Sequence, residues 1–210
     1  PEQAVATARR VAATLGTQAV PAAELLHPRQ WVGTPGQDLR SREQLVVNNS
    51  TLRREYLLGD DGPEGRAAAA VIAAVIADPF YSEMRTRQQL GYIVQAAAFE
   101  DERQTVALFV IQSGEHTASV LEARADAFIR TLPQQLAAMP AETWAAIVGG
   151  VRSRLLERDK SIAERAMRLF NLAYVEHGDW ARTDATVQAL DALTQARAGD
   201  LLARALAPQT

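Results

Sequence analysis

The chain has 210 residues, of which 48% are hydrophobic and 22% charged, and its net charge at pH 7 is -3. This composition excludes a disordered chain, and arginines dispersed among acids in a weakly acidic chain predict no nucleic-acid site. Cysteine is absent, which excludes disulfides, thiolate nucleophiles and cysteine-bearing metal sites. The length suffices for one large domain, alone or with a piece of another attached.

Membrane association is not predicted, because no apolar run approaches the length of a membrane span. The first residues, PEQAVATARRVAATLG, contain no continuous apolar stretch and do not resemble a signal peptide. We therefore expect a bacterial-type soluble protein, and the sequence leaves open whether it is cytoplasmic or periplasmic. The leading proline without a methionine is typical of a fragment or a processed chain.

The first elements in chain order are a helix, a linker and two strands. Apolar residues with helical spacing predict a helix over 2–15, and the proline-, glycine- and polar-rich stretch 17–40 predicts a linker between two units. The β-prone runs REQLVVNN (42–49) and LRREYLLG (52–59) predict paired or neighbouring strands.

A buried helix and a hairpin follow. The alanine-rich segment 64–77 predicts a helix packed against a sheet and ending at Asp78-Pro79, and residues 80–90 predict a second helical segment. The runs YIVQAAAFE (92–100) and QTVALFVIQ (104–112) flank a polar DER and predict a hairpin whose second strand is central in a sheet.

Beyond residue 116 the pattern is helical throughout. Pro140 suits the first turn of a helix, and Ser161 followed by Glu164 predicts a capping box. The predicted helices cover 116–138, 141–158, 162–177, about 181–192 and 195–206. The order of elements predicts an α+β domain with a mostly antiparallel sheet covered by helices. An exposed apolar face on 181–206 could be an interdomain or subunit contact, which the pattern does not distinguish from core.

Motifs for catalysis are missing. His27, His116 and His177 are isolated, with no second histidine at helical spacing, so turn and cap positions are the plainer interpretation and no metal site is predicted. No serine lies in a G-x-S-x-G turn and no phosphate-binding loop follows a strand. The glycine pair in IVGGV (147–151) predicts a close-packing site or a kink within a helix.

Other charged and aromatic residues have plain structural interpretations. The acids and bases between residues 154 and 165 alternate as on a solvated helix face. Trp144, Phe170 and Trp180 are assigned to packing.

The segment RTRQQLGYIV (85–94) is the candidate site. Arg85 is predicted on a helix that Gly91 closes in a left-handed conformation, and Tyr92 begins the next strand, so both side chains can project near one rim of the sheet. An arginine can hold a carbonyl or carboxylate, and a phenol can donate to a developing oxyanion. From the pattern alone, a solvated arginine and a packing tyrosine are the favoured interpretation.

This segment carries a family resemblance. The run EMRTRQQLGYIV resembles the L-R-T-x-x-Q-L-G-Y-x-V motif in the last domain of the pitrilysin and insulin-degrading-enzyme family of zinc peptidases, family M16. The segments ADPFYS, FVIQS, AFIRTLPQQLAAM and LLERDKSIAERAMRLFNLA resemble its neighbouring turn, strand and helices. The resemblance extends over about residues 41–206, and 1–40 resembles the helix and linker that join the third homologous domain to the fourth.

The resemblance implies an M16 peptidase (LuxS/MPP-like) domain over 41–210, in a protein of four related domains whose two halves enclose a chamber. It implies no metal site and no cofactor in this chain, with zinc held in the N-terminal half or a partner subunit. By position, Arg85 and Tyr92 would bind the peptide substrate and stabilise the transition state, with Gly91 structural.

Two hypotheses follow. In the first, the chain is the zinc-free C-terminal domain of a metallopeptidase and has no activity alone. In the second, it is a catalytically degenerate structural or interaction subunit of an M16-type complex, which the absence of a nucleophile and of a ligand set would also fit.

Overall fold

A computed structural model describes residues 2–15, 21, 38–44, 46–101 and 104–207. By internal contacts the chain divides into two compact units, residues 1–32 and residues 33–210. In the first unit, helix α1 (Glu2–Leu15) forms as predicted, with none of its residues buried. The predicted linker over 17–40 lies mostly outside the described residues.

The second unit contains a three-stranded antiparallel sheet in the order β1-β3-β2. Its strands are β1 (Ser50–Asp60), β2 (Ile93–Asp101) and β3 (Gln104–Ser113). The predicted hairpin is confirmed, and β3 is the central strand because its apolar residues are buried between two neighbours. The α+β class is confirmed.

One predicted strand is wrong. Residues 42–44 and 46–49 form no strand, and the side chains of Val46 and Val47 are exposed. β-branched residues favour a strand only where a partner edge and a covered face are available. In the part of the chain that the structure describes, β3 pairs with β1 and β2, and this run pairs with neither of the two edge strands.

The central helix is longer than predicted. Helix α2 (Pro63–Tyr81) passes through Pro79 and continues as the π-helical turn η2 (Ser82–Arg87). A proline inside a helix removes one backbone hydrogen bond, but Phe80 and Met84 are fully buried on its far side. Packing of these two side chains therefore outweighs the local break.

The continuous helix also corrects the expectation about membrane-length segments. Residues Pro63–Arg87 form a 25-residue stretch that is long and apolar enough to cross a membrane by length and composition alone. Half of its apolar window is buried inside the domain, which is also what the core helix of a folded domain shows. The prediction missed the stretch because it ended the helix at Pro79.

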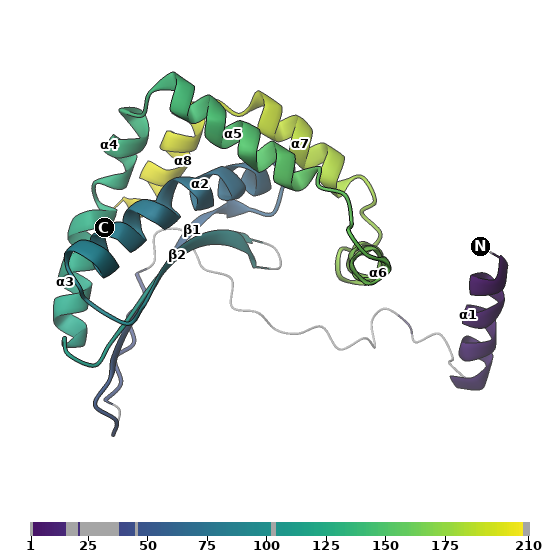
Figure 1. Ribbon diagram of the computed structural model, residues 1–210, viewed down its shortest axis with the longest axis horizontal. Coiled ribbons are helices and arrows are strands. Elements are labelled where there is room, and N and C mark those ends of the chain that lie inside the picture. Colours follow the sequence, from purple (N-terminus) through teal and green to yellow (C-terminus); the bar gives the residue numbers. More distant parts are fainter. Residues whose placement is uncertain (1, 16–20, 22–37, 45, 102–103, 208–210) are drawn as a thin grey trace. The chain divides into compact units, whose positions relative to one another are not determined.

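Helices cover one side of the sheet. In Figure 1, α2 lies along the sheet, and α5, α7 and α8 lie over α2. The remaining elements are α3 (Ala118–Ile129), α4 (Leu132–Ala137), α5 (Ala141–Leu155), α6 (Ile162–Phe170), η3 (Asn171–Val175), α7 (Arg182–Ala192) and α8 (Gln195–Leu206). The predicted helix 116–138 is two helices, because Pro133 enters the first turn of α4 and cannot continue the hydrogen bonds of α3.

Aromatic rings fill the space between α2 and the sheet. Phe109 of β3 has its ring centre 6.0 Å from that of Tyr56 and 5.1 Å from that of Phe80, both edge to face. Phe80 in turn lies 5.8 Å from Phe128 of α3. This cluster joins the sheet, α2 and α3 into one core.

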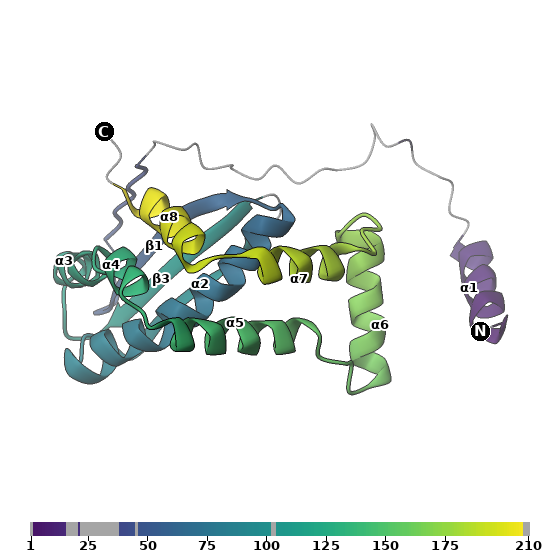
Figure 2. The same ribbon diagram turned by 90° about the horizontal axis from the view of Figure 1, so that it is seen from above.

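Some packing assignments made from the sequence are wrong. Trp144 does pack against the core, but Phe170 and Trp180 are more than half exposed. Helix α6 lies beyond the ends of α5 and α7 (Figure 2), and none of its residues is buried. For the 181–206 helices the sequence left contact surface and core open, and Leu190 and Leu202 belong to the core.

The glycine pair of α5 is not a close-packing site. A Cβ on Gly149 or Gly150 would have no described heavy atom within 4 Å. Both residues are exposed within a continuous helix.

The N-cap of α6 predicted at Ser161 is confirmed, while the Glu164 carboxylate accepts from the N–H of Lys160 in place of that of Ser161. The Ser161 hydroxyl accepts from the backbone N–H of Glu164 at 3.1 Å. Removing such a cap costs about 1 kcal/mol, and α6 has no buried residue to compensate. Ser161→Ala should therefore accelerate amide hydrogen exchange of 162–168 about fivefold. Ser153→Ala, at an exposed position of α5, is the control, and equal exchange in both variants would contradict the role of the cap.

Candidate functional site

The structure brings Arg85 and Tyr92 together. Arg85 Nη1 donates to the carbonyl oxygen of Gly91 at 2.8 Å. Its guanidinium carbon lies 5.9 Å from the centre of the Tyr92 ring, a cation–π contact. Two side chains that are seven residues apart in sequence therefore form one pair where η2 meets β2.

The turn between them is closed by backbone hydrogen bonds. The N–H of Gln88 donates to the Glu83 carbonyl and that of Leu90 to the Met84 carbonyl, each at 2.9 Å. Gln89, with φ of 51°, takes the left-handed conformation that was predicted for Gly91. That prediction is wrong, because Gly91 has no positive φ.

Gly91 is required for a different reason, a close approach to the central strand. A Cβ built on Gly91 would overlap the carbonyl oxygen of Gln112 and lie 2.9 Å from its carbonyl carbon. The same carbonyl accepts from the N–H of Tyr92 at 2.9 Å. The joint is thus fixed to β3 by a contact that only glycine permits.

The polar groups of the pair are available to a ligand. The Tyr92 side chain is 81% exposed, and its hydroxyl bonds to no residue that the structure describes. Arg85 is partly buried and has no carboxylate partner among the described residues. Glu83 instead pairs with Arg87 at 2.6 Å and accepts from Gln88 Nε2 at 2.8 Å. The acid nearest in sequence to Arg85 therefore does not neutralise it.

Sequence reasoning missed the residues that hold the pair. Gln112 lies on another strand, and only the register of the hairpin, in which it faces Ile93, brings it to the joint. Glu83 and Gln88 were not singled out either, because their spacing of five residues matches no α-helical pair, and only the π-helical turn η2 brings them together.

The sheet next to the pair has one face that the described helices leave uncovered. Strand register places Ile93, Gln112 and Thr51 in the row nearest the joint. The following rows are Gln95, Val110 and Arg53; Ala97, Leu108 and Glu55; and Phe99, Val106 and Leu57. This face is mixed in polarity, as is common for the face of an antiparallel sheet that is not packed on the core.

A metal site is not found among the described residues, which include no group of three or more His, Asp or Glu side chains that could hold an ion. His116 lies in the turn before α3, where its N–H donates to the Ser113 hydroxyl at 3.0 Å. His177 has a φ of 51° and ends a helical turn. His27 lies outside the described residues.

The sequence matches known proteins over about half its length. Residues 71–170 match the family model of the C-terminal lobe domain 4 of PQQ synthase PqqF-like proteins. Protease 3 of Escherichia coli K12 is 31% identical over 111 residues, which are 53% of this chain and 12% of that protein. The A-factor-processing enzyme of Saccharomyces cerevisiae is 32% identical over 114 residues, 54% of this chain and 11% of that enzyme. The chain thus spans about an eighth of these relatives.

The fold decides the assignment. The crystal structure of pitrilysin superposes with a TM-score of 0.69 at 26% identity, over 76% of this chain and 17% of that one. In sequence and in fold, the chain is therefore similar to the C-terminal-lobe domains of M16 peptidases. Two further structures share the fold of the M16-type domain at 14% identity: the periplasmic protease PqqL of E. coli, with a TM-score of 0.55, and an inactive peptidase domain from Bordetella parapertussis, with 0.57. The latter match covers 76% of this chain and 87% of that one, and the PqqL match 74% and 17%.

Proposed function

We propose that this chain is the non-catalytic C-terminal domain of a zinc metalloendopeptidase, which helps to enclose, bind and orient a peptide for hydrolysis at a zinc site in the N-terminal half. The observation that carries the proposal is the Arg85–Tyr92 pair, whose polar groups are held in place but have no acidic partner among the described residues. The similarity to C-terminal lobes of M16 peptidases supports it.

The two side chains suit different steps of peptide hydrolysis, Arg85 the binding of the substrate and Tyr92 the stabilisation of the transition state. The free N–H groups of Arg85 can hold a substrate carbonyl or carboxylate before reaction, which lowers KM. The Tyr92 hydroxyl can donate to the oxyanion as negative charge develops, which raises kcat. In this proposal the zinc that cleaves the bond is held by another part of the assembly, which agrees with the lack of a ligand group among the described residues.

The first experiment measures cleavage of a quenched fluorescent peptide of about ten residues. It compares this chain with the polypeptide extended upstream to its natural start, each with and without a chelator. Chelator-sensitive cleavage by the extended polypeptide alone is the expected result. Absence of cleavage in both would favour the alternative, a catalytically degenerate structural subunit.

Within the active assembly, Tyr92→Phe should lower kcat about tenfold or more, since one oxyanion donor contributes at least this much. Tyr174→Phe is the matched control, because Tyr174 is similarly exposed but lies on η3. Arg85→Gln should raise KM more than it lowers kcat. Unchanged kinetics in both site variants would rule out the assigned roles.

A further inference from the structure

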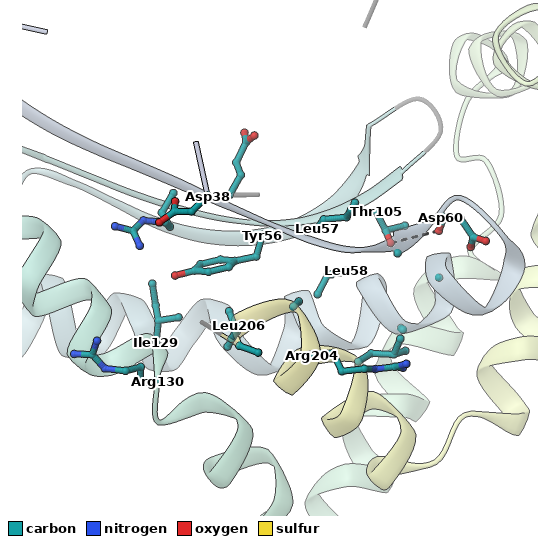
Figure 3. Close-up of a pocket in the computed structure, with 18 of the residues that line it drawn as sticks. Asp38, Tyr56, Leu57, Leu58, Asp60, Thr105, Ile129, Arg130, Arg204 and Leu206 are labelled. Atoms are coloured by element: carbon teal, nitrogen blue, oxygen red, sulfur yellow. Dashed lines mark hydrogen bonds between the residues drawn. The ribbon is translucent and has the colours of Figure 1, made fainter. Parts of the chain in front are cut away.

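A second candidate site lies along the other edge of the sheet. A groove of about 680 Å³ runs between β1 on one side and helices α3 and α8 on the other. In Figure 3, Tyr56 and Leu58 extend from the strand toward Ile129 and Leu206, which form the opposite side of an apolar floor. None of these residues belongs to the Arg85–Tyr92 pair.

The groove follows a strand edge that has no partner strand in the described part of the chain. β1 is the terminal strand of the order β1-β3-β2. The successive residues 54–60 all line the groove, so it runs along the margin of the strand and not over one face alone. An edge strand presents unpaired N–H and C=O groups to which an extended peptide can add as another strand.

The carboxylates that line the groove have polar partners, whereas two of its arginines have no carboxylate partner. Each of the five lining carboxylates already has a polar partner: Asp38 with Arg40, Glu55 with Arg53, Asp60 with the N–H of Gly62, Glu64 with Arg197, and Asp126 with Arg54. Two lining arginines, Arg130 and Arg204, have no carboxylate within ion-pair distance among the described residues. Asp60 has no cationic partner among the described residues, and Arg204 Nε donates to the carbonyl oxygen of Asp200 at 3.2 Å. The groove therefore offers an anionic ligand two arginines that have no carboxylate partner.

The two arginines flank the apolar floor. In Figure 3, Leu206 lies between Arg130 and Arg204 on the helical side of the groove. Side chains at i−2, i and i+2 of a strand point to the same side, about 7 Å apart in sequence order. A strand with an apolar residue at i and acidic residues at i−2 and i+2 would therefore match the floor and both arginines.

We propose that this groove binds an extended acidic segment of a separate polypeptide as a fourth strand on the free edge of β1. The central apolar side chain of that segment lies on the floor formed by Tyr56, Leu58 and Leu206. Its flanking carboxylates pair with Arg130 and Arg204. This site is separate from the proposed substrate site, so either proposal can fail without the other.

Tyr56 adds a hydrogen-bond donor to the floor. Burial raises the pKa of its phenol, against the lowering effect of the neighbouring Arg54 guanidinium. The phenol is therefore protonated at neutral pH and can donate to a backbone carbonyl or a carboxylate of the bound segment.

The test uses a fluorescein-labelled peptide, Thr-Glu-Thr-Leu-Thr-Glu-Thr, and fluorescence anisotropy with the whole chain. We expect saturable binding that weakens about tenfold or more when both glutamates are replaced by glutamine, because charge-assisted hydrogen bonds are lost. The protein variant R130Q/R204Q should lose affinity to a similar extent. The matched control R124Q/R154Q changes two exposed arginines outside the groove and should bind as the wild type does.

Hydrogen exchange distinguishes strand addition from mere charge attraction. Bound peptide should slow amide exchange within residues 54–58, and a peptide with proline on both sides of the leucine should neither bind nor protect. Binding without protection of β1, or equal loss in the control variant, would overturn the proposal. So would binding that appears only after removal of residues 1–37, since the groove would then belong to the chain's own leading segment.

Discussion

Gly91→Ala should lower the free energy of unfolding by about 2 kcal/mol or more, because the added methyl group overpacks the joint against β3. The added Cβ would overlap the Gln112 carbonyl oxygen and lie 3.2 Å from Cγ2 of Ile111. Backbone of the central strand cannot move aside as a flexible side chain can, so the joint must shift. Urea unfolding followed by circular dichroism measures the change.

The matched control is Gly149→Ala in α5. That glycine is exposed in a helix interior and a Cβ there meets no described atom. Alanine should therefore stabilise the protein by about 0.5–1 kcal/mol, the difference in helix propensity. Equal and small effects at Gly91 and Gly149 would show that the close approach to β3 is not a constraint.

Comparing Gly91→Ala with Tyr92→Phe should distinguish the loss of site geometry from the loss of the phenol hydroxyl. Arg85 donates to the Gly91 carbonyl, and Tyr92 follows it directly, so a shift of the joint displaces both side chains. In the active assembly, the variant should lose turnover even at temperatures where it remains folded. Tyr92→Phe removes only the hydroxyl and should leave the midpoint of unfolding nearly unchanged.

Phe109→Ala should destabilise the domain by about 3–5 kcal/mol, the usual cost of truncating a buried phenylalanine. Phe109 is fully buried in the central strand and contacts the rings of Tyr56 and Phe80 edge to face. Truncation would leave a cavity between α2 and the sheet. The backbone of β3 is hydrogen-bonded to a strand on each side, so it cannot readily move to fill that cavity. Thermal and urea unfolding both measure the loss.

Phe99→Ala provides the comparison on the same sheet. Phe99 is 38% exposed on the face that the described helices leave uncovered. Its truncation should cost about 1 kcal/mol or less. A cost as large as that at Phe109 would mean that the uncovered face is packed against something in solution.

Local patterns predicted most of the second unit. The β-prone runs 92–100 and 104–112 on either side of a polar turn identified the hairpin, and the helical spacing after residue 116 located five helical stretches. Errors occurred where burial overrides local preference. Pro79 predicted a helix end, but the buried Phe80 and Met84 carry the helix past it.

At the candidate site, too, the sequence predicted what depends on neighbouring residues and missed what depends on packing. The sequence alone placed Arg85 and Tyr92 on either side of a sharp joint, because residues in one short motif remain neighbours in any fold. Its M16 resemblance is confirmed by the similarity to pitrilysin and protease 3. The roles of Arg85 and Tyr92 in peptide hydrolysis stay a prediction.

The sequence by itself determined the type and order of the elements and the position of the joint, since these depend on neighbouring residues. Only the tertiary structure decided why residue 91 is glycine, which carboxylates are already paired, and which edge of the sheet is free. These properties depend on Gln112, Arg130 and Arg204, which meet their surroundings through strand register and helix packing. Contacts between residues distant in sequence are set by the packing of the whole domain, and no local pattern records them.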